Sequence, residues 1–160
     1  HFRALNATIE RMEEKKTEEF TDIEALLSEG KRIQIHPKGF SMYPLLVPGR
    51  DEVILEKTDP KTARRGDVLL YRRKEGILVL HRVYRHDDTG FYMVGDHQKE
   101  IEGPLFEEQI RGKMTAFIRR GRWVSERNLW YVLYSRIWLF LRPLRPAIEQ
   151  LVHKIRTGGT

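Results

Sequence analysis

The 160-residue sequence contains no cysteine, which excludes disulfide bonds, thiolate nucleophiles and thiolate zinc sites. It has no run of 18 or more apolar residues, so we expect no membrane-spanning helix, and its first residues lack a signal-peptide pattern. Its six histidines do not form a ligand-spaced cluster, and no glycine-rich phosphate loop is present. We therefore expect neither a metal site nor another cofactor.

The net charge of +6 is concentrated toward the C-terminus. The segment from Arg119 to Thr160 carries nine basic and two acidic residues, whereas residues 1–118 carry 20 basic and 21 acidic residues. A basic segment is attracted to an anionic lipid surface or to nucleic acid. A solvated helix face has the same composition, so charge alone does not identify a partner.

Three regions follow from the hydrophobic pattern, and the hydrophobic fraction of 40% is sufficient for a packed core. Residues 1–30 read as a helical N-terminal segment, with a capping box at Thr21 and Glu24 and a stop at Gly30. Residues 31–120 read as a domain of short strands separated by glycine, proline or aspartate. Residues 121–160 read as a basic amphipathic helical tail. The expected strands contain Ile33 and Ile35, then Val53–Leu55, Val68–Tyr71, Ile77–Val83, Phe91–Val94 and Met114–Ile118.

These short strands predict a mainly β fold, namely a coiled β-sheet or partial barrel with an N-terminal helix and a C-terminal helical tail. The most informative segment of the β region is Gly39–Pro44, which places Ser41 on a turn. Serine is a poor nucleophile unless a nearby group accepts its proton, and His81 in an apolar run is suited to that task. A buried histidine bonded to a backbone carbonyl is the alternative reading of His81. We interpret Ser41 and His81 as the nucleophile and base of a hydrolase.

The surrounding motifs occur in a recognisable order between Ile33 and Ile118. They are Gly39–Pro44, Pro48–Leu55, Arg65–Tyr71, Leu80–Val83, Tyr92–Asp96 and Ile110–Met114. Together they resemble the signal peptidase and self-cleaving repressor superfamily, whose nucleophile lies in a Gly-x-Ser-Met-x-Pro segment. Most members of that superfamily use lysine as the base, and His81 at the matching position resembles the branch that uses histidine. The resemblance implies a β-rich catalytic core and a substrate with small residues near the cleaved bond.

The third catalytic member has two candidates in the sequence. The histidine branch takes an acid from a Gly-Asp-Asn-Asn-like segment or from just after it, and this chain has Gly95-Asp96 followed later by Glu102. We rank Asp96 and Glu102 equally as groups that orient His81, although Asp96 also suits a turn. His36 is expected near the cleft, whereas His86, His97 and His153 are expected at the surface.

The oxyanion hole and the cleft floor are expected close to the nucleophile. The Ser41 backbone amide is the natural oxyanion donor. Lysine-type relatives often carry a hydroxyl two residues before the serine, but Gly39 stands there in this chain, so a second oxyanion donor must be the backbone at Gly39 or lie elsewhere. Met42 and Pro44 are expected to shape the substrate-binding floor. A groove between strands would bind an extended peptide by strand addition.

The leading prediction is a bacterial serine endopeptidase that cleaves a precursor or leader peptide, with a Ser–His dyad or a Ser–His–acid triad. Its activity is expected to fall as His81 is protonated, near the ordinary histidine pKa of about 6.5. A flat rate down to about pH 5 would then argue against His81 as the base. The alternatives are a self-cleaving regulator and an inactive peptide-binding module.

The expected location is cytoplasmic or peripheral to a membrane. Residues 127–156 are the candidate contact with an anionic membrane surface, and a helix face of Trp130, Tyr134, Trp138 and Leu141 is expected to make it. Packing on the β core and a homodimer contact are the alternatives for this face. Nucleic acid is not an expected partner.

Overall fold

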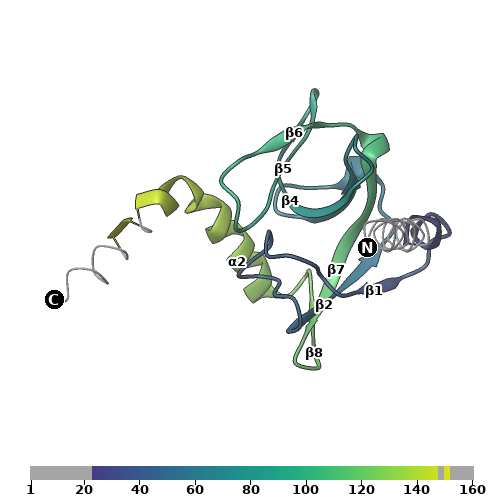
Figure 1. The fold of residues 1–160 in the computed structure, drawn as a ribbon, viewed down its shortest axis with the longest axis horizontal. Helices are drawn as coiled ribbons and strands as arrows, with labels where there is room; N and C mark the ends of the chain where they lie inside the picture. The colour runs from purple at the N-terminus through teal and green to yellow at the C-terminus, as the bar shows by residue number, and fades with distance from the viewer. Residues whose placement is uncertain (1–22, 148–149, 152–160) are drawn as a thin grey trace, which may run out of the picture.

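The computed structural model describes residues 23–147 and 150–151, and it is built around one antiparallel sheet (Figure 1). The strands are β1 (Ile33–Ile35), β2 (Asp51–Glu56), β3 (Val68–Arg72), β4 (Leu78–Asp87), β5 (Gly90–Val94), β6 (Glu102–Leu105), β7 (Ile110–Arg119) and β8 (Arg122–Ser125). Three short 3-10 helices, η1 (Pro60–Thr62), η2 (Glu107–Gln109) and η3 (Arg142–Leu144), and the helix α2 (Leu129–Phe140) complete the labelled elements. The predicted mainly β class is confirmed.

The strand order in the sheet is β1-β2-β7-β3-β4-β5-β6, and β8 pairs with β7. β7 pairs with three strands, with β2 on one side and with β3 and then β8 on the other. Register shifts interrupt several of these pairings, as bulges do where a sheet coils. The sheet coils without closing into a barrel, and β1 and β6 form its edges among the strands described.

β3 is buried on both faces of the sheet, and a different hydrophobic cluster covers each face. Successive side chains of a strand point to opposite faces. Val68 and Leu70 belong to a cluster that includes residues of the Ser41 segment and α2, whereas Leu69 and Tyr71 belong to a second cluster with β5 and β6. The unbroken apolar run in this strand is therefore the pattern of a strand covered on both sides.

Two strands of the sheet were not predicted from the sequence, each for a local reason. β6 contains Gly103 and Pro104, which are unfavourable in strands, and it is tolerated because it lies at an edge of the sheet. β8 returns from β7 through a two-residue turn at Arg120 and Gly121, both with positive φ, which matches the twist of a hairpin. The sheet consequently continues past residue 120 to Ser125.

The described part of the N-terminal segment is a helix over residues 23–28 that ends as predicted at Gly30. Gly30 has φ +79°, and its N–H bonds the Leu27 carbonyl, as in a glycine-terminated helix. Leu27 is fully buried, and Glu24 binds Arg72 and Arg111 of the sheet. The helix is therefore part of the folded core. The proposed capping residue Thr21 lies outside the described residues.

α2 begins at Asn128, whose side chain accepts hydrogen bonds from the N–H groups of Trp130 and Tyr131. Its buried side chains are Tyr131, Ser135 and Leu139, so the helix packs on the β core. The expected membrane face is wrong in its composition. Trp138 turns inward and donates a hydrogen bond to the Asp96 carbonyl at 3.1 Å, whereas Trp130 is 77% exposed. No helix within the described residues is long and apolar enough to cross a bilayer.

Candidate active site

Ser41 lies in a turn between β1 and β2 that is anchored on both sides. Gly39 has φ +81°, a conformation that favours glycine, and the Tyr43 N–H bonds the Phe40 carbonyl at 3.0 Å. Met42 is buried in the core. Ser41 itself is only partly buried, so the turn presents its side chain at the surface of a cavity.

An ion cluster holds the segment after the turn. Buried Asp51 accepts hydrogen bonds from Arg50, Arg119 and the Val47 N–H, and Arg50 also donates to the Pro44 carbonyl at 3.1 Å. Burial opposes ionisation of Asp51, but these hydrogen bonds outweigh it and lower the pKa of the carboxyl. The Asp51 cluster therefore fixes the backbone that follows Ser41.

The loop after β5 also contacts the Ser41 turn through the backbone. The His97 N–H bonds the Ser41 carbonyl at 2.9 Å. A Cβ at Gly95 would lie 2.6 Å from the same carbonyl oxygen, so only glycine allows this approach. Gly95 in the Gly-Asp pair is thus explained by contact with the segment that carries Ser41.

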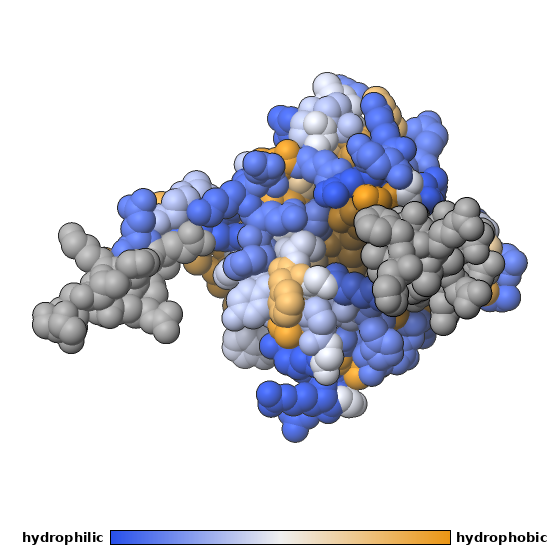
Figure 2. All heavy atoms as spheres, in the orientation of Figure 1, coloured by the Kyte–Doolittle hydropathy of each residue, from blue (hydrophilic) through white to orange (hydrophobic). Residues whose placement is uncertain are grey.

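Ser41 and His81 line the same cavity, which has a volume of about 640 Å³. The apolar part of its lining comes from Met42, Leu46, Leu70, Leu78 and Leu80. Figure 2 shows a largely hydrophilic face with hydrophobic atoms in a recess and at several other points. Within residues 23–147, no hydrogen bond joins the side chains of Ser41 and His81. Catalytic contacts are often looser without substrate, so shared lining of one cavity is the relevant observation.

His81 is held by a chain of hydrogen bonds across the sheet. Its Nδ1 lies 3.0 Å from Tyr71 Oη, which lies 2.7 Å from Glu102 Oε2. Arg73 donates two hydrogen bonds to the same carboxylate. Leu69 of β3 pairs with His81 of β4, and Tyr71 is two residues further along β3 on the same face of the sheet. Tyr71 is therefore a diagonal neighbour of His81. Glu102 comes from β6, three strands from β3, and the coiling of the sheet brings it to Tyr71.

This chain of hydrogen bonds fixes the tautomer of His81. Hydrogen bonds from Arg73 and Tyr71 outweigh the effect of burial and lower the pKa of Glu102, so its carboxylate only accepts. Burial and the charge of Glu102 raise the pKa of Tyr71, so its hydroxyl stays protonated and donates to Glu102. The Tyr71 oxygen must then accept from His81 Nδ1–H. His81 Nε2 is left without a proton and can act as a base.

The burial of His81 changes the pH dependence expected from sequence. Its side chain is 1% exposed. Burial lowers the pKa of His81 to about 4, and the nearby Glu102 charge opposes this shift only in part. His81 is thus neutral far below pH 6.5. The expectation of an acid limb near 6.5 is therefore revised, and a flat rate down to pH 5 is compatible with His81 as the base.

Asp96 and Glu102 are separated by the structure. The Asp96 carboxylate is buried and binds Arg82 through two hydrogen bonds of 2.7 and 2.8 Å. Arg82 follows His81 in β4, so its side chain points to the opposite face, where Ser135 of α2 accepts a further hydrogen bond from it. Of the two candidate acids, Glu102 is the one connected to His81.

The remaining predicted residues are distributed as follows. Gly39, Met42 and His36 line the cavity with Ser41, whereas Pro44, expected with Met42 in the cleft floor, is not among its lining residues and accepts a hydrogen bond from Arg50. No residue in the described part of the chain accepts a hydrogen bond from the Ser41 N–H, which leaves this amide available as an oxyanion donor. His86 and His97 are exposed, and His153 lies outside the described residues. The described ranges contain no group of three potential metal ligands.

Sequence reasoning missed Tyr71, Arg73 and Arg82 as parts of the two networks. The period-two alternation of β3 and β4 placed Tyr71 on the face of His81, and this signal was available in principle. Arg82 follows His81 directly, so the same alternation assigns it to the other face. The position of Arg73 depends on Glu102 of β6, and β6 was not predicted.

Neither a known family model nor a curated protein sequence matches this chain. The resemblance to the signal peptidase superfamily therefore rests on the motifs quoted above.

Proposed function

We propose that this protein is a serine endopeptidase that cleaves precursor or leader peptides, with Ser41 as nucleophile and His81 as general base. The observation that supports this most strongly is the shared cavity of Ser41 and a His81 whose Nδ1 is tied to Tyr71 and Glu102. That arrangement supplies a serine, an unprotonated Nε2 and an orienting group, which are the parts that acyl transfer requires.

In the proposed reaction, Ser41 Oγ attacks the scissile carbonyl while its proton passes to His81 Nε2. The Ser41 N–H stabilises the resulting oxyanion. His81 then donates the proton to the leaving amine as the peptide bond breaks, and a water molecule hydrolyses the acyl-enzyme by the reverse sequence. Glu102 stabilises the transient imidazolium through Tyr71, and the low pKa of His81 makes it a good proton donor to the amine.

The edge strand β1 suggests how the substrate binds. Among the described strands β1 pairs only with β2, and Gln34 and Ile35 of β1 line the same cavity as Ser41. An extended peptide can add to such an edge through backbone hydrogen bonds, with side chains entering the apolar lining. We therefore propose an extended peptide segment with small or apolar side chains next to the cleaved bond.

The test is incubation of the protein with a mixed synthetic peptide library, followed by mass spectrometry of new termini. The native protein should generate cleavage products that Ser41→Ala and His81→Ala lack, while Ser125→Ala on β8 serves as the matched serine control. Equal cleavage by Ser41→Ala would remove Ser41 from the mechanism.

An inactive peptide-binding module is the second candidate, because no hydrogen bond links Ser41 to His81 within the described part of the chain. Peptides that are retained by the native protein but never cut would favour this candidate. The same library therefore separates the two functions.

A further inference from the structure

The outward face of α2 carries an unbroken line of exposed apolar side chains. Trp130, Leu133, Ile137 and Phe140 are spaced by three, four and three residues, so they share one side of the helix. Trp130 is 77% and Phe140 75% exposed, and Leu129 and Leu144 extend the line at its two ends. We call these six residues the outer stripe. The opposite side of the helix already packs on the sheet through Tyr131, Ser135 and Leu139.

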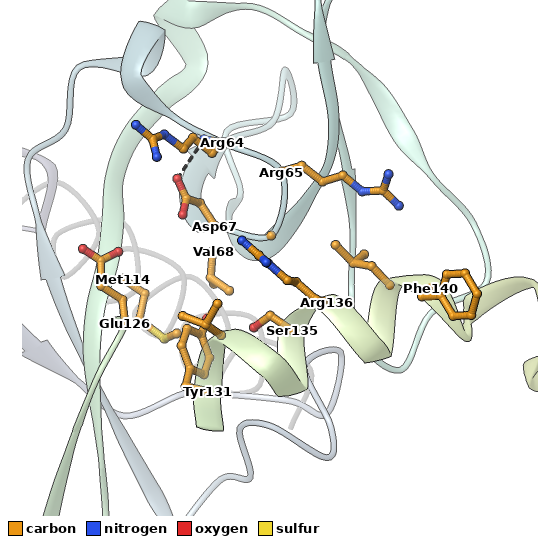
Figure 3. A pocket seen from close by; sticks show the side chains of 13 residues that line it. Arg64, Arg65, Asp67, Val68, Met114, Glu126, Tyr131, Ser135, Arg136 and Phe140 are labelled. Carbon is orange, nitrogen blue, oxygen red and sulfur yellow. Dashed lines mark hydrogen bonds between the residues drawn. The ribbon is translucent and has the colours of Figure 1, made fainter. Parts of the chain in front are cut away.

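Three arginines lie along one edge of the outer stripe. Arg64 and Arg65 precede β3, and Arg136 lies in the middle of α2; all three line a second cavity of about 670 Å³ with Phe140. Figure 3 shows Arg136 extending from α2 toward the segment that carries Arg64 and Arg65. This cavity is separate from the one that contains Ser41 and His81.

Nearby carboxylates compensate the positive charge of these arginines only in part. Asp67 and Glu126 line the same cavity, but both form ion pairs with Lys113. Within residues 23–147, no carboxylate forms an ion pair with the guanidinium group of Arg64, Arg65 or Arg136. An exposed apolar stripe beside arginines that keep an excess of positive charge is complementary to a surface that is apolar inside and anionic outside.

We propose that the outer stripe lies in the boundary between headgroups and acyl chains of an anionic bilayer, with Arg64, Arg65 and Arg136 binding lipid phosphates. Aromatic side chains such as Trp130 and Phe140 favour this depth, and arginine binds phosphate through two parallel hydrogen bonds. α2 has 12 residues and is about 18 Å long, so it lies along the surface instead of crossing it.

A second copy of the chain fits this face less well. A twofold dimer through the outer stripe would place two α2 helices against each other and bring the two Arg136 side chains close together. α2 contains no acidic residue that could neutralise them. Like charges at such a contact are destabilising, whereas a bilayer supplies the missing anions.

The experiment is flotation of the full chain with two kinds of vesicle. One kind contains phosphatidylcholine alone, and the other contains equal parts of phosphatidylcholine and phosphatidylglycerol. The protein should float with the mixed vesicles, and added salt should release it, because salt screens the phosphate contacts. Ser41→Ala should bind equally, so a failure of the proposed peptidase function leaves this result intact.

Two groups of substitutions identify the surface. Trp130→Ser with Phe140→Ser should weaken binding by more than about tenfold, and so should the triple change of Arg64, Arg65 and Arg136 to Gln. Phe106→Ser, an exposed aromatic beside η2, is the control for the stripe. Lys31→Gln, Lys57→Gln and Lys74→Gln together are the control for charge.

Three results would overturn the proposal. The first is that the native chain fails to float with the mixed vesicles at low salt. The second is that the Trp130/Phe140 variant or the triple arginine variant binds the vesicles as tightly as its control. The third is a dimer in sedimentation velocity without lipid that Trp130→Ser converts to monomer, because the outer stripe would then be the contact between two copies of the chain.

Discussion

His81 and Arg82 are consecutive residues of β4 and both are almost fully buried, yet their charge states differ. Arg82 remains charged because Asp96 forms a direct two-point ion pair with it, and this pair raises the pKa of Arg82 against the effect of burial. His81 has only an indirect link to Glu102, through Tyr71, and it remains neutral. A direct carboxylate partner thus favours a fixed charge, whereas an intervening hydroxyl orients a base without protonating it.

The two sides of β4 are therefore expected to respond differently to substitution. The Arg82 side should govern stability, and the His81 side should govern chemistry.

Arg82→Met should have the largest effect on stability, a loss of about 3–5 kcal/mol in the free energy of unfolding, because it leaves the Asp96 carboxylate buried and unpaired. Arg82→Met combined with Asp96→Asn should be more stable than the single variant, since the orphaned charge is gone. Arg85→Met is the control, because the exposed Arg85–Asp87 pair on the same strand contributes at most about 1 kcal/mol. Urea denaturation measures all three, and equal losses for Arg82→Met and Arg85→Met would contradict the ion-pair account.

Tyr71→Phe should reduce peptide cleavage about 10- to 100-fold while the protein remains folded. The substitution leaves His81 Nδ1–H buried without an acceptor, which costs about 1–3 kcal/mol and releases the tautomer. Tyr92→Phe is the matched control, because the Tyr92 hydroxyl bonds exposed Thr89 and not His81. The rate of cleavage of a peptide found in the library assay is the measurement, and native activity in Tyr71→Phe would remove the tyrosine from the mechanism.

The smallest expected effect concerns the pH dependence of kcat/KM. In the native protein, kcat/KM should fall at low pH with a midpoint near pH 4, because His81 is neutral above its lowered pKa of about 4. Glu102→Gln should move this midpoint to lower pH, since the carboxylate stabilises the imidazolium. Arg73→Gln should move it to higher pH, since the guanidinium destabilises the imidazolium. A midpoint that stays near 6.5 in the native protein and both variants would show that burial does not control this base.

The strands with β-branched and aromatic runs, such as β2, β3 and β5, were predictable because local composition and burial agree there. β6 was not, since Gly103 and Pro104 argue against a strand and only its edge position permits one. The same omission explains why Asp96 and Glu102 ranked equally. Their separation depends on the opposite faces of His81 and Arg82 and on the coil that brings β6 to β3, and coiling is a tertiary property.

The loop after β5 has a mechanical consequence, because it is bonded on both sides. Trp138 and Arg145 donate hydrogen bonds to the Asp96 carbonyl from the α2 side, and the next residue, His97, donates to the Ser41 carbonyl. A shift of α2 against the sheet must therefore displace the Ser41 turn or break one of these bonds. If lipid binding and peptide binding favour the same position of α2 and of the Ser41 turn, each ligand raises the affinity for the other. Thermodynamic linkage requires that the two affinities rise by the same factor.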